Sequence, residues 1–257
     1  MKVAITTSKD DFLLISRAEA YAAELAIPYI NRQRSSLDNL RSEYSLDYVL
    51  IVEQDRVILK GATSLAWHPS MAVPRLKALR EGSRDPMVDA LDLKPGYSVL
   101  DCTLGLGADA LVAASIVGKQ GSVTGLEADK YIAFITKLGM QNFSGQNIHI
   151  KAIVDRVTVI NQTYEEYLPV QLDNSYDVVY FDPMFRYSLI KSAALNALRP
   201  LARHAPLTEN VLREALRVAR YRVVLKENAK SREFARLNAP LVSGGRYSSI
   251  AYGIWIK

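Results

Sequence analysis

The sequence is poor in the residues that crosslink chains and bind transition metals. Cys102 is its single cysteine, so an internal disulfide is excluded. Such sparse use of cysteine is typical of a reducing compartment, and we expect the protein to be cytoplasmic. The three histidines show no ligand spacing with each other or with Cys102, so we expect no metal in the functional site.

Long hydrophobic runs are also missing. The longest, such as Tyr48–Val52, fall far short of the roughly 20 residues that cross a bilayer. The N-terminus lacks a basic segment followed by an apolar stretch, so we expect neither a secretory signal nor a membrane partner. Neither sign of charge dominates, because 32 lysines and arginines oppose 27 aspartates and glutamates. The net charge of +5 weakly favours a polyanionic partner such as RNA.

Short strands and helices alternate within residues 1–66. Apolar residues recur at helical spacing over Leu14–Leu25, and Asp47–Lys60 has the alternation and central turn of a hairpin. Further expected elements are strands at Val3–Thr7 and Pro28–Ile30 and helices at Ser36–Tyr44 and Val73–Arg80. Residues 1–66 are thus predicted to form a small α/β domain, and residues 67–86 a connector that folds over the functional site.

From residue 87 onward, strands and helices alternate regularly. This order implies a mostly parallel, doubly wound sheet with right-handed crossovers over residues 87–257. The last strand, Tyr247–Trp255, follows strand Arg222–Lys226 with little helix between them, so we expect it to be antiparallel. The other predicted strands are Ser98–Asp101, Ser122–Glu127, Val157–Ile160 and Tyr176–Asp182, and the predicted helices are Asp109–Val117, Lys130–Phe143 and Glu209–Ala219.

The loop Asp101–Gly107 (DCTLGLG) is the first feature that indicates chemistry. It follows a strand, at the sheet edge where ligands gather in parallel sheets. Gly105 and Gly107 let the backbone turn tightly and approach a ligand. Glu127 ends the next strand about 20 residues further on, where a carboxylate can accept hydrogen bonds from ribose hydroxyls. The pattern therefore predicts a cofactor that contains a nucleoside.

Three interpretations of this loop remain open. Gly105–Ala110 fits the G-x-G-x-x-A pattern of dinucleotide sites, the same loop fits S-adenosylmethionine, and glycines of this kind also serve simple turns. Asp101 favours S-adenosylmethionine, because its carboxylate can meet the cationic amino-acid end of that molecule but lies unfavourably beside a pyrophosphate.

Residues Asp182–Phe185 (DPMF) follow an apolar strand and lie at the same predicted sheet edge. An exocyclic base amine is a weak nucleophile because its lone pair is delocalised into the ring. The carboxylate of Asp182 and a backbone carbonyl can hold the amine hydrogens and aim the nitrogen at a methyl group. Pro183 shapes the turn, and Phe185 can stack on an unpaired or flipped base. We predict that Asp182, Pro183 and Phe185 form the catalytic element, and the alternative is an ordinary turn.

Together these segments resemble a known family. Asp101–Ala110, Glu127, Tyr180–Phe185 and Val223–Lys226 are similar, in the same order, to the bacterial 16S ribosomal RNA guanine-N2 methyltransferase J family. The similarity covers roughly Pro86 to Trp255. It implies a class I methyltransferase with a seven-stranded, Rossmann-like sheet and S-adenosylmethionine as cofactor. It also implies guanine N2 of ribosomal RNA, free or in the small ribosomal subunit, as the target.

The loop pattern and the resemblance together predict which residues hold the methyl donor. These are Asp101, Thr103, Gly105, Gly107, Ala108, Asp109, Glu127, Ala128, Thr163 and Tyr164. The chain departs from the family at Ala108 and Ala128, where arginine is common, and residues 1–66 match none of its motifs and form an extra N-terminal α/β unit. Two other functions stay open: an NAD-dependent oxidoreductase, and a non-catalytic module that binds the donor or RNA.

Overall fold

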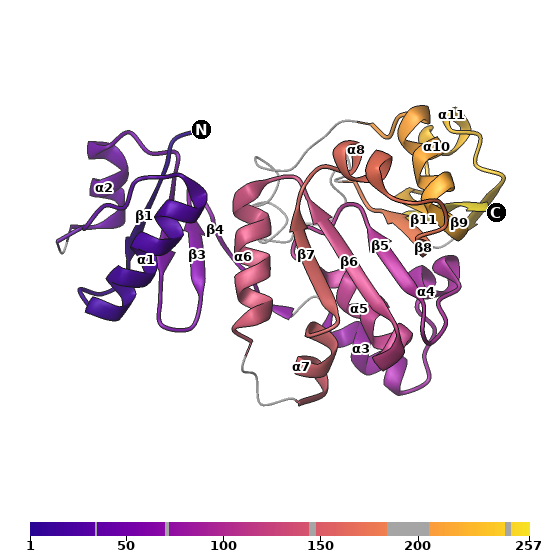
Figure 1. The fold of residues 1–257 in the computed structure, drawn as a ribbon, viewed down its shortest axis with the longest axis horizontal. Coiled ribbons are helices and arrows are strands. Elements are labelled where there is room, and N and C mark those ends of the chain that lie inside the picture. Colours follow the sequence, from indigo (N-terminus) through magenta and orange to yellow (C-terminus); the bar gives the residue numbers. More distant parts are fainter. Residues whose placement is uncertain (34, 70–71, 144–147, 184–205, 245–247) are drawn as a thin grey trace.

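The chain folds into two β-sheets that lie side by side (Figure 1). A computed structural model describes residues 1–257 apart from 34, 70–71, 144–147, 184–205 and 245–247. A four-stranded sheet, in the order β1-β2-β3-β4, forms one end of the molecule. A seven-stranded sheet, in the order β10-β11-β9-β8-β5-β6-β7, forms the other. The predicted α/β class, with a smaller N-terminal sheet beside a larger one, is confirmed.

The small sheet and its helices make up residues 1–66, which we call the N-terminal unit. β1 pairs in parallel with β2, and β3 and β4 extend the sheet by antiparallel pairing. Helix α1 packs on one face through buried residues such as Leu14 and Ala18. The elements are β1 (Val3–Thr7), α1 (Phe12–Leu25), α2 (Leu37–Glu43), β2 (Tyr48–Val52), β3 (Val57–Lys60) and β4 (Ser64–Ala66).

Two parts of the N-terminal unit differ from the prediction. The expected strand at Pro28–Ile30 is reduced to one bridge, in which Tyr29 pairs with Ile5. The strand β4 was not predicted, because its three residues are too few to show an alternating pattern. The predicted hairpin is confirmed as β2 and β3, and β4 pairs with β3 across a tight turn and extends it to a three-stranded meander.

In the interior of the large sheet, β5 is paired in parallel with both β6 and β8. Strand β9 continues the parallel order beyond β8. Strand β11 runs antiparallel to both of its neighbours, β9 and β10, which confirms the predicted antiparallel last strand. The strands are β5 (Ser98–Asp101), β6 (Ser122–Glu127), β7 (Val157–Asn161), β8 (Tyr176–Phe181), β9 (Ala219–Asn228), β10 (Leu241–Gly244) and β11 (Ile250–Ile256).

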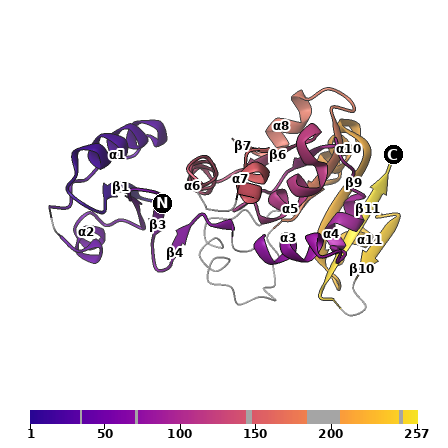
Figure 2. The same cartoon turned by 90° about the horizontal axis from the view of Figure 1, so that it is seen from below.

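Helices cover both faces of the large sheet (Figure 2). Val99 belongs to a core cluster that includes residues of α5, whereas the next residue, Leu100, belongs to a cluster that includes residues of α10. This alternation is the mark of a strand buried on two sides. No described helix combines the length and apolar character needed to span a bilayer. The helices are α3 (Val73–Arg80), α4 (Pro86–Leu91), α5 (Ala108–Val117), α6 (Lys130–Gln141), α7 (Ile148–Val154), α8 (Tyr164–Tyr167), α10 (Glu209–Val218) and α11 (Glu233–Arg236).

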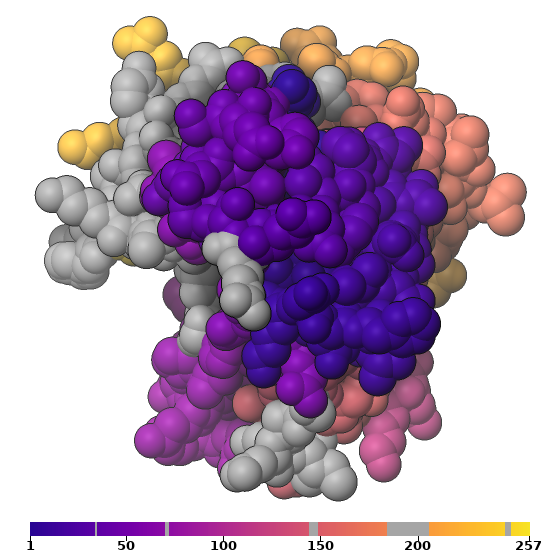
Figure 3. Space-filling model, turned by 90° about the vertical axis from the view of Figure 1, so that its left-hand side faces the viewer, coloured from indigo at the N-terminus to yellow at the C-terminus, as the bar shows by residue number. Residues whose placement is uncertain are grey.

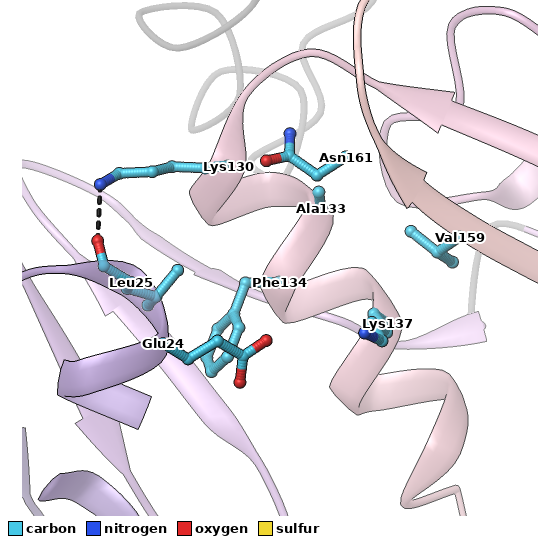
Figure 4. Close-up of a pocket in the computed structure, with 8 residues that line it drawn as sticks. All are labelled: Glu24, Leu25, Lys130, Ala133, Phe134, Lys137, Val159 and Asn161. Carbon is cyan, nitrogen blue, oxygen red and sulfur yellow. Dashed lines mark hydrogen bonds between the residues drawn. The ribbon is translucent and has the colours of Figure 1, made fainter. Parts of the chain in front are cut away.

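The N-terminal unit packs against helix α6 of the larger part. The ring of Tyr21 meets Phe134 edge to face at 5.1 Å between centroids, and the ammonium of Lys130 donates to the Leu25 carbonyl at 2.7 Å. A cleft between α1 and α6 is lined by Leu25, Lys130, Phe134 and Lys137, among others (Figure 4). Seen from this end, the N-terminal unit fills the centre of the surface (Figure 3). Because apolar residues of both parts form one continuous core cluster, the unit and α6 support each other.

Candidate active site

The predicted site residues meet at one edge of the large sheet. Asp101 pairs with Gly125 on one side and with Tyr180 on the other, so β5, β6 and β8 end within two residues of one another. The pairing of Phe181 with Leu225 brings the end of β8 beside β9 in the same way. These are the carboxyl ends of parallel strands, where ligands bind in sheets of this kind.

The glycine loop between β5 and α5 follows a path that needs its glycines. Gly105 and Gly107 have φ angles of +55° and +76°, in the left-handed region that disfavours side chains. A Cβ atom on Gly107 would lie 2.5 Å from the Met140 Cε, whereas one on Gly105 would meet open space. The loop is tied to β6, because the Leu104 N–H donates to the Leu126 carbonyl at 2.9 Å. Gly105 thus leaves room for a ligand above the backbone.

Glu127 closes the other side of this loop. Its Oε2 accepts from the Gly105 N–H at 3.0 Å, and its Oε1 accepts from the Asp129 N–H at 2.8 Å. Burial raises the pKa of Glu127 to about 7, against the lowering effect of these two hydrogen bonds. The carbonyl of Ala128 accepts from the Asn161 amide at 3.3 Å, which fixes the turn after β6. The acidic residue is therefore held beside the glycine loop, as the sequence predicts.

Asp101 is a buried carboxyl at the base of the loop. It is 3% exposed, and its Oδ1 accepts from the Thr103 N–H at 3.0 Å. Burial raises its pKa to about 8. Within the part of the chain that the structure describes, no cationic side chain forms an ion pair with it. A cationic ligand would offset the cost of this burial, so the site fits a molecule with a positively charged end.

Asp182 is joined directly to the glycine loop. Its backbone N–H donates to the Thr103 hydroxyl at 2.6 Å, and its Oδ2 accepts from the Lys226 ammonium at 2.6 Å. Burial raises the pKa of Asp182 to about 6, although Lys226 opposes this shift. Pro183 is half-buried beside it, and Phe185 lies outside the described residues. The two predicted motifs therefore form one site.

Asp109, at the start of α5, lies at the centre of a charged cluster. Its Oδ1 accepts from Arg75, and its Oδ2 accepts from the Tyr180 hydroxyl at 2.7 Å and from Lys226 at 2.9 Å. Burial opposes its ionisation, but Lys226 and Arg75 hold its pKa well below the usual range. Both oxygens are thus used by protein groups, and contact with the donor through its side chain stays a prediction.

The segment at residues 67–86 contributes to the site more than a connector would. Arg75 on α3 forms a two-pronged ion pair with Asp85, at 2.7 and 2.9 Å, and also reaches Asp109. The Trp67 indole N–H donates to the Leu106 carbonyl of the glycine loop at 3.1 Å. The sequence did not predict either role, because both partners lie more than 30 residues away along the chain.

Thr163 and Tyr164 lie just past the end of β7, whose last residue Asn161 pairs with Glu127. Thr163 caps α8, since its hydroxyl accepts from the Glu166 N–H and the Glu166 carboxylate accepts from Thr163 in return. The ring of Tyr164 packs edge to face on Phe181 at 5.5 Å. Both residues have structural roles here, and their contact with the donor stays a prediction.

Two other predictions concern cysteine and metal chemistry. Cys102 is 3% exposed, and burial raises the pKa of its thiol, so the thiolate needed for nucleophilic attack is disfavoured. Cys102 is therefore a small buried core residue rather than a nucleophile. Within the described ranges, no group of three or more histidine, cysteine, aspartate or glutamate side chains could hold a metal ion.

Known proteins share this architecture and sequence pattern. Residues 38–246 match a family model described as "Putative SAM-dependent methyltransferase". The chain is 36% identical over 222 residues to the "Uncharacterized protein YpiP" of Bacillus subtilis, and the match covers 86% of each protein. It is also 36% identical over 92 residues to the "Ribosomal RNA small subunit methyltransferase J" of Francisella tularensis subsp. novicida, and it spans only 36% of that enzyme's length.

A solved structure shares the fold over nearly the whole chain. The crystal structure of the SAM-dependent methyltransferase NGO1261 from Neisseria gonorrhoeae aligns with 98% of this chain and 95% of that chain, with a TM-score of 0.68 and 18% identity. The alignment includes the N-terminal unit. The family match also decides between the two cofactors that the glycine loop left open, in favour of S-adenosylmethionine. The chain belongs to the family of S-adenosylmethionine-dependent methyltransferases.

Proposed function

We propose that this methyltransferase modifies an exocyclic base amine, guanine N2, in ribosomal RNA of the small ribosomal subunit. The observation that supports it most is the hydrogen bond from the Asp182 N–H to the Thr103 hydroxyl. This bond holds the Asp-Pro turn against the glycine loop, which we also call the donor loop. A second support is the partial similarity to an enzyme whose name specifies ribosomal RNA of the small subunit.

The side chain of Asp182 has the chemistry that an amine acceptor needs. A carboxylate accepts hydrogen bonds from the amine hydrogens, which orients the nitrogen lone pair and favours loss of a proton once the new carbon–nitrogen bond forms. S-adenosylmethionine supplies an electrophilic methyl group, and its sulfur keeps the electron pair of the bond that breaks. Phe185, two residues after Pro183, is proposed to stack on the base.

The donor-binding part of the proposal follows from the contacts of the loop. Asp101 would face the cationic amino-acid end, because it is a buried carboxyl without an ion pair among the described residues. Glu127 would accept from the ribose hydroxyls. Gly105 would let the donor approach the backbone, since a Cβ there meets only open space.

Donor binding is expected to release protons at pH 7. Because the pKa of Asp101 is about 8, this carboxyl is mostly protonated in the free protein at pH 7, and a cation beside it favours the ionised form. We expect about one half to one proton to be released for each donor bound. Calorimetric titration in buffers of different ionisation enthalpy measures this number.

Two variants identify the residue that releases the proton. Asp101→Asn should remove most of the release and weaken donor binding. Glu127→Gln is the matched control, because the pKa of Glu127 is about 7 and its release should be smaller. Equal binding enthalpies in all buffers would contradict the role of Asp101.

The acceptor is tested by direct methylation. The purified protein is incubated with methyl-labelled donor and, separately, with small ribosomal subunits, their naked RNA, DNA and protein. We expect label in RNA, as N2-methylguanosine on digestion to nucleosides. Label confined to protein would exclude the RNA substrate, and donor affinity without turnover on any acceptor would indicate a non-catalytic binding module.

A further inference from the structure

Lys226 lies at the carboxyl end of β9, directly beside the Asp-Pro turn. Its position at the site edge is one at which a lysine could contact RNA phosphate. Its ammonium instead lies 2.6 Å from the Asp182 Oδ2 and 2.9 Å from the Asp109 Oδ2. The side chain is only 15% exposed, and moving the ammonium to solvent would break both ion pairs.

We propose that Lys226 is a positioning residue, which fixes the carboxylate of Asp182 against the start of helix α5. This inference rests on the role proposed above for Asp182. A lysine has three N–H donors, and two of them are directed at carboxylates on different elements. Lys226 therefore joins the amine-orienting group to the helix that follows the donor loop.

Asp109, the second carboxylate partner of Lys226, is itself held in place by other residues. Asp109 is held by the Tyr180 hydroxyl from β8 and by Arg75 from α3, and Arg75 is held in turn by Asp85. Asp109, Arg75 and Asp85 in this chain of contacts each have at least two partners. A carboxylate attached to such a chain has little freedom to rotate, which is what precise orientation of an amine requires.

Lys226 also controls the charge of Asp182. Among the other groups near Asp182, the carboxylate of Asp109 disfavours its ionisation, whereas Asp101, with its raised pKa of about 8, and the Tyr180 hydroxyl are mostly neutral at pH 7. Tyr252 on β11 pairs with Lys226 across the sheet, and the positive charge of Arg75 faces Asp109. Without Lys226, three carboxyls would share this region, so Asp182 would be protonated at higher pH. A protonated Asp182 loses acceptor capacity toward the amine.

The test compares three substitutions at this position. Lys226→Met removes the ammonium, Lys226→Gln keeps a polar side chain without charge, and Lys226→Arg keeps the charge. Arg222→Met is the matched control, because Arg222 lies on the same strand but pairs with Asp92 and the Ala90 carbonyl, away from Asp182. Methylation of unmodified small ribosomal subunits is measured from pH 5.5 to 9, and donor affinity is measured by calorimetry.

We expect Lys226→Met to lower kcat about 100-fold at pH 7, with KM for the subunit changed less than about threefold. The acid limb of the kcat profile should move to higher pH, so that the loss is greatest at pH 6 and smallest at pH 9. Lys226→Arg should recover most of kcat, and Arg222→Met should keep both kcat and the profile. A KM effect without a change in kcat or in the profile would indicate phosphate contact and overturn the proposal.

A second measurement does not depend on the RNA substrate. Carbon-13 NMR of the aspartate carboxyl carbons follows the titration of Asp182 in the free protein, with the resonance assigned by its loss in Asp182→Asn. We expect its pKa to rise in Lys226→Met, or in Lys226→Gln should the Met variant not fold. An unchanged titration would overturn the proposal even if the RNA activity is confirmed. An altered titration together with a fully active Asp182→Ala variant would refute the proposed role of Asp182 instead.

Discussion

An Asp182→Ala variant is expected to transfer methyl groups about 10²- to 10⁴-fold more slowly than the natural protein, with its affinity for the donor changed little. The substitution removes the group proposed to orient the amine and to favour loss of its proton, and effects of this kind have that magnitude. Lys226 keeps its ion pair with Asp109, so every cation of the remaining cluster still has a carboxylate partner. Initial rates on small ribosomal subunits and calorimetric donor titrations measure the two quantities.

Asp177 provides the matched control for this variant. It lies at the opposite end of the same strand, β8, where its carboxylate binds Ser98 and Arg220. Asp177 is buried, and it lies at the end of the strand away from the glycine loop. Asp177→Asn should cost stability and leave kcat close to its natural value. Full activity of Asp182→Ala would sink the proposed role of Asp182.

Asp109→Ala is expected to destabilise the fold by about 1–3 kcal/mol, because it leaves the buried Tyr180 hydroxyl without its acceptor and removes one of the two carboxylate partners of Arg75 and of Lys226. Urea unfolding without the donor measures the loss, so that binding does not contribute to it.

The control for this loss is Asp89→Ala, which breaks an ion pair with Arg84 that is largely exposed, and we expect a much smaller effect. A normal stability of Asp109→Ala combined with a large loss of donor affinity would assign Asp109 to donor binding instead. That result would support the role predicted for it from the family resemblance.

Much of the large sheet could be predicted because its strands are buried on both faces. Val99, Leu100, Val178 and Val179 are fully or almost fully buried, and such apolar runs alternate with long helices along the sequence. Elements that lack this signal were missed. All four residues of β10 are exposed, α7 has only seven residues, and α4 begins at Pro86, in a stretch expected to be a connector. Asp85 caps α4, and Pro86 occupies the first position of that helix. This Asp-Pro pair is a helix start signal that can be identified in the sequence.

The site was predicted in its parts but not in its connections. Glycines, an acidic strand end and an Asp-Pro turn can be identified locally, and their meeting follows from the parallel order of the strands. The ion pairs of Asp109 cannot be obtained in this way, because Arg75 lies 34 residues before it and Lys226 lies 117 residues after it. The sequence places Lys226 at the end of a strand, but burial of its ammonium depends on which carboxylates the fold places around it.

The contact between Trp67 and the glycine loop bears on how such proteins can be recombined. The indole N–H of Trp67 donates to the Leu106 carbonyl, and a Cβ on Gly139 would collide with the Trp67 side chain. Trp67 is therefore packed tightly between the glycine loop and α6. A chimera that exchanges N-terminal units between relatives should therefore be joined before Trp67. The repeated strand–helix pattern, which starts at residue 87, would suggest a later junction. A chimera joined at residue 87 would place the relative's residue at position 67 against the glycine loop. Exchanging the N-terminal unit would then also alter the donor site.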